Sequence, residues 1–197
     1  MPQLTEPDNL PHPPYAKEEL VLAGSTLRQT VRVSAGGRRM RLRFSNAFGG
    51  APLPITQVCV AFPEGGRAGV SAVEAGTARR VTFSGRSSVV VPVGAQFVSD
   101  PLDLPLAPAT VLAVTVHLAD GQASRAVTSH PGSRTTSYLA PGNQAEATDL
   151  TGSSTGCVPA TPPRASPSPT REQAATGCST TASVPTPWPG WTATCSR

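Results

Sequence analysis

Residues 27–44 read LRQTVRVSAGGRRMRLRF, and this stretch decides the fold class. On either side of the Gly-Gly pair, apolar residues recur at alternate positions, a period that is typical of β-strands with one buried face. Because glycine accepts the positive φ of a tight turn, residues 35–38 predict a short hairpin whose two strands pair antiparallel. The predicted inward face comprises Leu27, Gln29, Val31, Val33, Met40, Leu42 and Phe44.

Short segments of the same kind continue along the chain. Turn residues separate them, and the chain has 22 Pro and 18 Gly against only 5% aromatic residues. No segment has the periodicity of a convincing amphipathic helix. Regular short strands between Gly- and Pro-rich turns predict an all-β fold, an antiparallel β-sandwich or jelly roll. The further candidate strands are 55–62, 80–83, 88–93, 96–98, 111–118 and 135–139.

The composition predicts three parts. Residues 1–22 are rich in proline and are expected to form an extended arm over the surface. Residues 23–150 form the predicted β-sandwich. Residues 151–197 are a Pro/Ser/Thr-rich tail, which holds three of the four cysteines and both tryptophans and for which we expect no stable fold.

Arginines occupy the polar positions of the first two strands. They could bind an anionic partner, because guanidinium groups suit phosphate and carboxylate. We expect instead a solvated outer sheet face, since antiparallel sheets commonly keep one face in water and no exposed aromatics are interleaved to stack on bases. With a net charge of +4 and 14% charged residues, we predict no nucleic-acid partner. The row consists of Arg28, Arg32, Arg39, Arg41 and Arg43.

No catalytic motif is found in the sequence. The block G-D-S, the zinc motif H-E-x-x-H, a Walker loop and a D-x-x-H pair are all absent. We expect His117 and His130 at the rim or in a turn, and Cys59 as a small buried apolar residue. The prediction is therefore that the chain has no catalytic, cofactor-binding or metal-binding residue of its own.

Four strings carry a family resemblance: TLRQTVRVS at 26–34, RLRFSNAFG at 41–49, VSDP at 98–101 and HPGSRTTSYL at 130–139. They resemble the N-terminal β-sandwich of two-domain SGNH/GDSL-family hydrolases, and the resemblance covers most of residues 1–150. It implies a following flavodoxin-like α/β/α domain, which carries a serine nucleophile in G-D-S, oxyanion-hole Gly and Asn, and an Asp-x-x-His pair. The implied parent activity is ester or acetyl-ester hydrolysis, and the implied partner of the sandwich is that catalytic domain.

The sequence departs from the family where the chemistry begins. Family members usually continue after residues like 152–156 with a Trp-Tyr strand into the G-D-S block, whereas Cys157-Val158-Pro159 follows here. One inserted base, which turns TGG-TAC-C into TGC-GTA-CC, gives this change. Regrouped codons over 171–194 permit a reading that resembles the family's oxyanion-glycine block. We therefore interpret the tail as an out-of-frame remnant of the catalytic domain. Because the interval from Cys157 to this block is too short to hold the whole G-D-S segment, a deletion or a second error in addition to the inserted base stays open.

An ordinary disordered linker is the alternative reading of the tail. Cys157, Cys178 and Cys195 could also form a disulfide framework if the protein is secreted. The family is secreted, but Met1-Pro2-Gln3-Leu4-Thr5-Glu6 lacks the basic and apolar regions of a signal peptide, so the chain as written is expected in the cytoplasm. No apolar stretch approaches the roughly 18 residues of a membrane span.

Two functional hypotheses follow. In the first, the chain is a truncated esterase-family protein that keeps the accessory sandwich and is itself inactive. In the second, the sandwich is a stand-alone module that binds carbohydrate or a protein surface through rim turns at 48–50 and 129–134.

Overall fold

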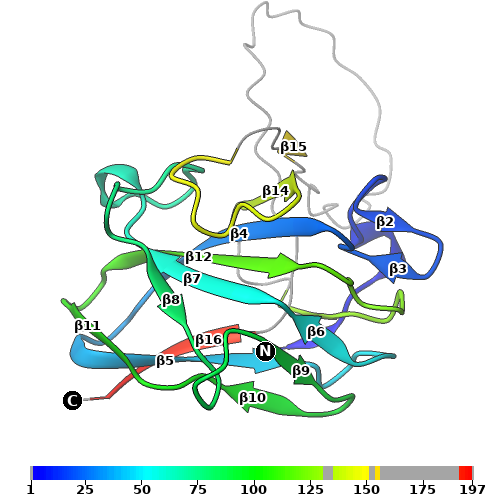
Figure 1. Ribbon diagram of the computed structural model, residues 1–197, viewed down its shortest axis with the longest axis horizontal. Helices are drawn as coiled ribbons and strands as arrows, with labels where there is room; N and C mark the ends of the chain where they lie inside the picture. The colour runs from blue at the N-terminus through cyan, green and yellow to red at the C-terminus, as the bar shows by residue number, and fades with distance from the viewer. Residues whose placement is uncertain (1, 131–134, 151–153, 156–190, 197) are drawn as a thin grey trace, which may run out of the picture.

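Two β-sheets packed face to face form the body of the molecule (Figure 1). The computed structural model describes residues 2–130, 135–150, 154–155 and 191–196. One sheet has six strands, in the order β15 (Ser154–Thr155), β14 (Ser137–Pro141), β4 (Ser25–Arg32), β12 (Val111–Leu118), β7 (Gln57–Ala61) and β8 (Arg79–Val81). The other has four: β5 (Gly37–Ser45) pairs with β10 (Gln96–Val98), β11 (Leu102–Leu106) and β16 (Trp191–Ser196).

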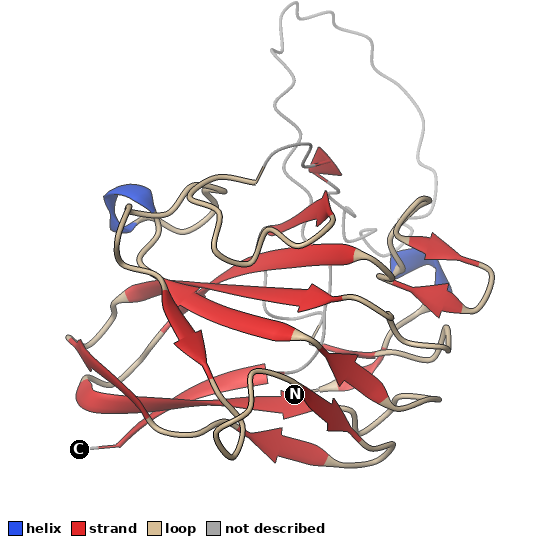
Figure 2. Cartoon of the chain, viewed as in Figure 1, coloured by secondary structure: helices blue, strands red, loops and turns tan. Residues whose placement is uncertain are grey.

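Three short strand pairs complete the described part of the chain. All pairing between named strands is antiparallel, and among the described residues the helical content is limited to the 3-10 turns η1 (Pro7–Asn9) and η2 (Glu64–Gly66) (Figure 2). The prediction of an all-β antiparallel sandwich is confirmed. No helix among the described residues is long and apolar enough to cross a membrane. The pairs are β1 (Gln3–Leu4) with β13 (Thr128–Ser129), β2 (Ala16–Lys17) with β3 (Leu20–Val21), and β6 (Leu53–Ile55) with β9 (Val89–Val91).

The predicted strands are mostly present, and the exceptions have local causes. The candidates 96–98 and 111–118 coincide with β10 and β12. The candidate 55–62 is divided at Thr56, because its first part pairs with β9 and its second part with β12. Strand β11 was not predicted, since Pro105 interrupts its pattern, and the register with β5 shifts between Asp103 and Leu106.

The predicted hairpin between the first two strands is wrong. Strand β4 pairs with β12 and β14, whereas β5 belongs to the other sheet. The connection at residues 33–36 crosses between the sheets, so the two apolar faces meet across the core. Glycine at position 36 serves close approach instead of a hairpin turn, because a Cβ there would lie 2.7 Å from the backbone oxygen of Leu106.

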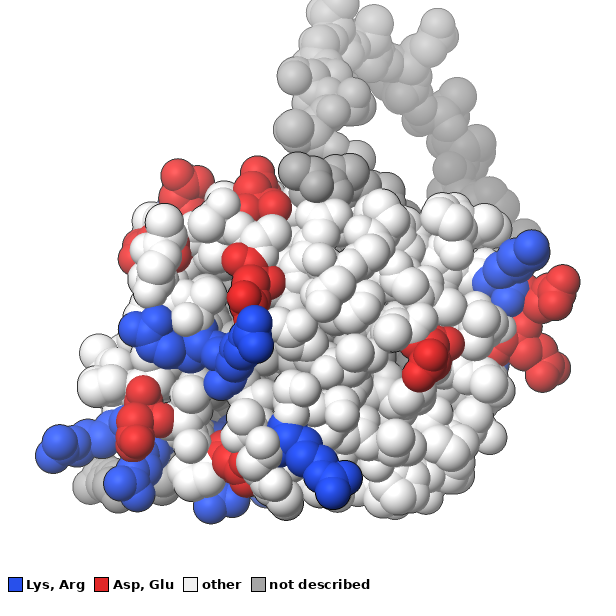
Figure 3. Space-filling view, viewed as in Figure 1, with Lys and Arg blue, Asp and Glu red and all other residues white. Residues whose placement is uncertain are grey.

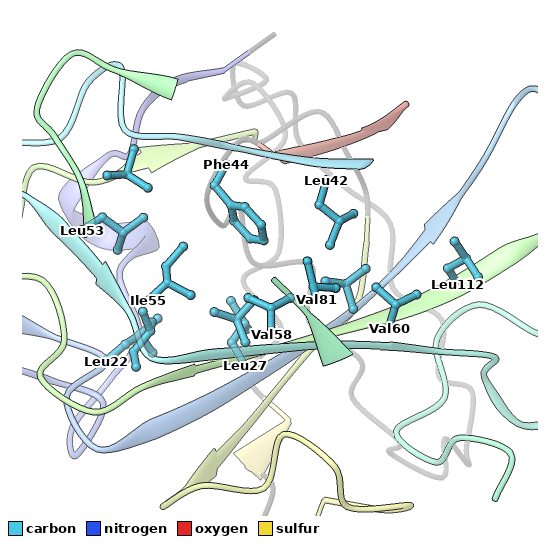
Figure 4. Close-up of a cluster of buried hydrophobic side chains, with 14 of the residues drawn as sticks. Leu22, Leu27, Leu42, Phe44, Leu53, Ile55, Val58, Val60, Val81 and Leu112 are labelled. Atoms are coloured by element: carbon cyan, nitrogen blue, oxygen red, sulfur yellow. The ribbon is translucent and has the colours of Figure 1, made fainter. Parts of the chain in front are cut away.

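The core fills the space between the two sheets (Figure 4). Leu27 and Val58 point from the six-stranded sheet toward Leu42 and Phe44 of β5, and all four side chains are at most 2% exposed. Phe44 also packs edge-on against Phe83, with 5.7 Å between the ring centroids.

The N-terminal segment is more integrated than expected. Leu10, Tyr15, Val21 and Leu22 are buried in the main core, and the Tyr15 hydroxyl donates a hydrogen bond to the backbone oxygen of Leu139 at 3.3 Å. The expectation of an arm lying over the surface is corrected, because its apolar side chains close one end of the sandwich.

The predicted tail falls largely outside the described residues. Two short segments of it, β15 and β16, are strands that pair with β14 and β5. We expected no stable fold for the tail, and apart from these two paired segments that expectation falls on residues outside the described part of the chain.

Candidate functional site

The outer face of the six-stranded sheet is covered by two loops, residues 67–78 and 142–150, which lie above the sheet in Figure 1. The loops bond to each other, since the Val73 amide donates to the backbone oxygen of Thr148 at 2.7 Å. They also bury small apolar groups against the sheet, among them Val73 with Ala113 and Leu150 with Tyr138. The loops therefore cover the part of this face that lies around Arg28 and Cys59.

Arg28 lies on this face and is only 1% exposed. The expectation of a solvated arginine row is wrong at this position, because the loops cover it. The other four arginines of the row are exposed. Sequence alternation correctly placed Arg28 on the outer face, but it carried no information about what packs on that face.

The buried guanidinium of Arg28 joins the sheet to both loops. Its Nε donates to the Thr115 hydroxyl at 2.8 Å, and its two terminal nitrogens donate to the backbone oxygens of Ser71 at 2.5 Å and Ala147 at 2.6 Å. Burial lowers the pKa of Arg28, and the Asp149 carboxylate partly offsets this effect. Because an arginine stays protonated in proteins, the side chain is a permanent charge that fixes the loops.

Cys59 lies on the same face and is 2% exposed, which confirms the prediction of a small buried residue. Its Sγ lies 4.0 Å from Glu146 Oε1 and 3.8 Å from Gln57 Nε2. Burial raises the pKa of the Cys59 thiol, and the hydrogen bond from Gln57 opposes this only in part. Since the thiolate is the nucleophile, a covered thiol with a raised pKa is unreactive at neutral pH.

An open polar hollow of about 510 Å³ lies beside Cys59. Glu146 accepts hydrogen bonds from Arg80 Nε and, at 2.9 Å, from Gln57 Nε2, and the Arg80 bond lowers the pKa of Glu146. Asn143 in turn donates to Gln57 Oε1 at 3.0 Å. The hollow can hold a polar group, but its side chains bond mainly to one another and supply no activated nucleophile. It is lined by Gln57, Arg80, Asn143, Gln144, Glu146, Ala147 and Asp149.

Of the three histidines, His117 has its Nδ1 3.4 Å from the Thr26 hydroxyl, which itself donates a hydrogen bond to the backbone oxygen of Gly142 at 2.6 Å. His117 is buried on β12 instead of lying at the rim, and its Nδ1 is 3.1 Å from the backbone oxygen of Ser25. Because a carbonyl oxygen only accepts, Nδ1 carries the proton in this contact. His130 is half-buried directly after β13. The turn that follows it, residues 131–134, lies outside the described residues.

Asn46 forms a polar corner on the strand β5 side of the sandwich. Its Nδ2 donates to the backbone oxygens of Ala51 at 2.9 Å and Val91 at 3.1 Å, and its Oδ1 accepts from Gln122 Nε2 at 2.9 Å. Gly49 is required beside it, since a Cβ there would lie 1.8 Å from Asn46 Oδ1. Phe48, the first residue of the turn 48–50 that the binding-module hypothesis uses, is 47% exposed.

Asp100 holds the turn that follows β8. Its carboxylate accepts from the Thr82 hydroxyl at 2.7 Å and from the backbone amides of Ser84 at 2.9 Å and Gly85 at 2.8 Å. The Gly85 bond, followed by the Thr82 bond, lowers the pKa of Asp100. The neighbouring Ser99 hydroxyl accepts from the Leu42 amide at 2.9 Å, so both residues fix backbone.

A second hollow of about 740 Å³ lies beside the β6–β9 pair. Its walls include apolar Ile55, Val89 and Phe97, and Arg86 and Asp120 also line it.

The described residues contain no group of three or more His, Cys, Asp or Glu side chains placed to hold a metal ion.

A scan against protein-family models finds no match, and a search among curated proteins finds no similar sequence. The candidate site therefore consists of structural polar hubs and two open hollows. Sequence reasoning missed the hub at Arg28; the small outward residues Ala113, Thr115 and Cys59 were the available signal for a covered face.

Proposed function

We propose that the chain is the non-catalytic N-terminal β-sandwich of an SGNH/GDSL-type ester hydrolase and that it does not hydrolyse esters by itself. The observation that carries the proposal is where the resembling strings lie. Arg28, Asn46 with Gly49, and Ser99 with Asp100 all belong to these strings, and all are hubs that hold the fold. The resemblance thus rests on residues with specific structural duties as well as on generic strand alternation.

The chemistry of the hubs supports a structural role for this domain. Arg28, Asn46 and Asp100 each bond to backbone groups of turns or loops, and Cys59 is a protonated, covered thiol. A serine hydrolase needs a nucleophile within hydrogen-bond reach of a base, together with donors for the oxyanion. The proposal assigns those groups to a second domain, which the family carries after the sandwich.

The tail keeps its proposed interpretation as an out-of-frame remnant of that second domain. Residues 156–190 lie outside the described part of the chain, and they include most of the stretch 171–194 on which the out-of-frame reading rests. The parent activity proposed from the resemblance is hydrolysis of ester or acetyl-ester groups through a serine-centred triad.

The test compares two proteins from the same locus. The first is this chain, and the second is the product of the longest reading frame obtained when the base inserted near codon 157 is removed. We expect the chain to release p-nitrophenol from p-nitrophenyl acetate no faster than buffer, and the second protein to turn over with saturation. A saturable activity of the chain itself that a serine-reactive phosphonate abolishes would overturn the proposal.

A stand-alone carbohydrate- or protein-binding module is the second candidate. The observation that favours it is the exposed ring of Phe48 on the rim turn, since aromatic faces commonly contact sugar rings and partner surfaces. Binding to a glycan panel that is lost in Phe48→Ala, with the fold unchanged, would support this candidate over the first.

A further inference from the structure

Strand β5 is paired on both of its edges. One edge carries β10 and β11. The other carries β16 over six consecutive pairs, from Trp191 opposite Phe44 to Ser196 opposite Arg39. Among the described residues, only this C-terminal segment pairs with the second edge, and residues 156–190, which precede it in the chain, are not described.

We propose that this second edge of β5 is a strand-acceptor site that binds an extended peptide antiparallel, with a preference for acidic residues opposite Arg41 and Arg43. In this chain its own residues 191–196 occupy the edge, and a separate peptide of suitable pattern replaces them. The inference rests on the pairing and the charges of β5 and does not depend on the proposed function.

The backbone of β5 suits such a role. Met40, Leu42 and Phe44 point into the core and are 1–2% exposed, so the strand is anchored along its length. A sheet edge presents a row of N–H and C=O groups that pair readily with another strand. Peptide recognition by strand addition takes its affinity from these main-chain bonds and its selectivity from alternate side chains.

The positive charges beside this edge explain why acidic peptide residues are preferred. Arg39, Arg41 and Arg43 alternate with the buried residues and are exposed on the outer face, roughly 7 Å apart along the strand. Arg39 is already paired with Asp103 at 2.7 Å. Arg41 donates a hydrogen bond to the backbone oxygen of Ser99 at 3.3 Å, and the side chain of Arg43 has no hydrogen bond or ion pair within the described ranges. Basic groups gather along the lower part of the molecule in Figure 3, where Figure 1 places the layer that contains β5.

The register identifies the peptide positions that meet these arginines. Thr192 lies opposite Arg43, and Thr194 lies opposite Arg41. Directly opposite residues of an antiparallel pair share a sheet face, and opposite charges there are favourable. A peptide with glutamate at these two positions therefore gains two cross-strand ion pairs without any change on its inward face.

The test vacates the edge in the full chain and refills it. Ala193→Pro with Thr194→Pro removes the C-terminal segment as a pairing strand, because proline lacks the amide donor. Fluorescein-labelled peptides of residues 189–197, with Cys195 replaced by Ser, are then titrated by anisotropy. Three versions are compared: the native threonines, Thr192→Glu with Thr194→Glu, and Thr192→Lys with Thr194→Lys.

We expect saturable binding of the native peptide and slower amide exchange at residues 39–44 of the vacated chain. In low salt the glutamate peptide binds tighter than the native one by roughly two- to thirty-fold, and the lysine peptide binds more weakly. Arg41→Gln with Arg43→Gln removes the glutamate preference. The charge-matched control Arg32→Gln with Arg79→Gln, two exposed arginines on other strands, leaves it intact.

Absence of saturable binding to a vacated chain with an unchanged circular dichroism spectrum would overturn the acceptor site. Equal affinities for the glutamate and lysine peptides would overturn the charge preference. If the double proline variant does not fold, the unmodified chain is used with excess glutamate peptide. Faster exchange at 191–196, with β5 still protected, then supports replacement, and unchanged exchange at 191–196 contradicts it.

Discussion

The outer faces of the two sheets begin from the same sequence pattern and end differently. Arg28 on β4 and Arg41 on β5 both occupy outward positions between apolar residues, yet Arg28 is 1% exposed and Arg41 is solvated. The difference comes from residues 67–78 and 142–150, which cover Arg28 on one sheet, whereas no described loop covers Arg41 on the other. Alternation therefore indicates on which face a residue lies, while the loops decide whether that face meets water.

Replacing the buried arginine gives the largest effect. Arg28→Met leaves the Thr115 hydroxyl and the loop carbonyls of Ser71 and Ala147 without their donor. Because each unsatisfied buried polar group costs about 1–3 kcal/mol, we expect the free energy of unfolding to fall by about 3–5 kcal/mol in urea denaturation.

Alkylation of Cys59 shows whether the loss is local. If the loops loosen, iodoacetamide reacts with Cys59 in Arg28→Met at least roughly ten times faster than in the unmodified chain, as site-resolved mass spectrometry would report. A variant as stable as the parent and with equally slow alkylation would show that the covered face does not depend on Arg28.

Replacing either of two hydrogen-bonded carboxylates, Asp100 or Glu146, is expected to lower stability less than replacing Arg28. Asp100 accepts bonds from the amides of Ser84 and Gly85, whereas Glu146 at the edge of the covered face accepts from the side chains of Arg80 and Gln57. Because backbone donors are fixed in place by the turn, we expect Asp100→Asn to lower the melting temperature more than Glu146→Gln at pH 7.

The pH dependence follows from the sign of the shift. The pKa of Asp100 in the folded protein is lowered, so its contribution is present above the unfolded pKa of about 4 and is lost as the pH falls through the lower folded value. The difference in melting temperature between the parent and Asp100→Asn should therefore shrink below about pH 4. A difference that stays constant between pH 7 and pH 3 would exclude this assignment.

The smallest effect is expected on the bare face. Arg41→Met and Arg43→Met remove solvated charges from the same strand, and such substitutions usually change the free energy of unfolding by less than about 0.5 kcal/mol. The measurement is the same urea denaturation that is used for Arg28. A loss as large as that of Arg28→Met would show that the outer face of β5 is also covered.

Much of the fold could be predicted from local pattern. The period-two alternation at 27–33 and 39–44 identified both strands and their inward residues, and 96–98 and 111–118 were located to the residue. Local pattern could not decide whether β4 pairs with β5, because a Gly-Gly connection is compatible both with a hairpin and with a crossing between two sheets. Strand β11 was missed because a proline stands inside it.

The candidate site could be predicted only in part. Burial of Cys59 followed from its apolar neighbours, but burial of Arg28 depended on loops far away in the sequence. His117 was expected at a rim because it stands near the end of a strand. The 142–150 loop instead covers that end of the face: the backbone oxygen of Gly142 accepts a hydrogen bond from the hydroxyl of Thr26, which lies opposite His117 on β4. The small outward residues Ala113, Thr115 and Cys59 are the only local trace of this cover in the described strands.

The measurement that tests the central claim most directly is sequencing of the coding DNA through codon 157 and well past codon 197. The account predicts that one reading frame there encodes a Trp-Tyr strand followed by a G-D-S block, so that the sandwich precedes a serine hydrolase domain. A confirmed frame, with no such block encoded in any frame downstream, would contradict the assignment to an SGNH/GDSL-type hydrolase.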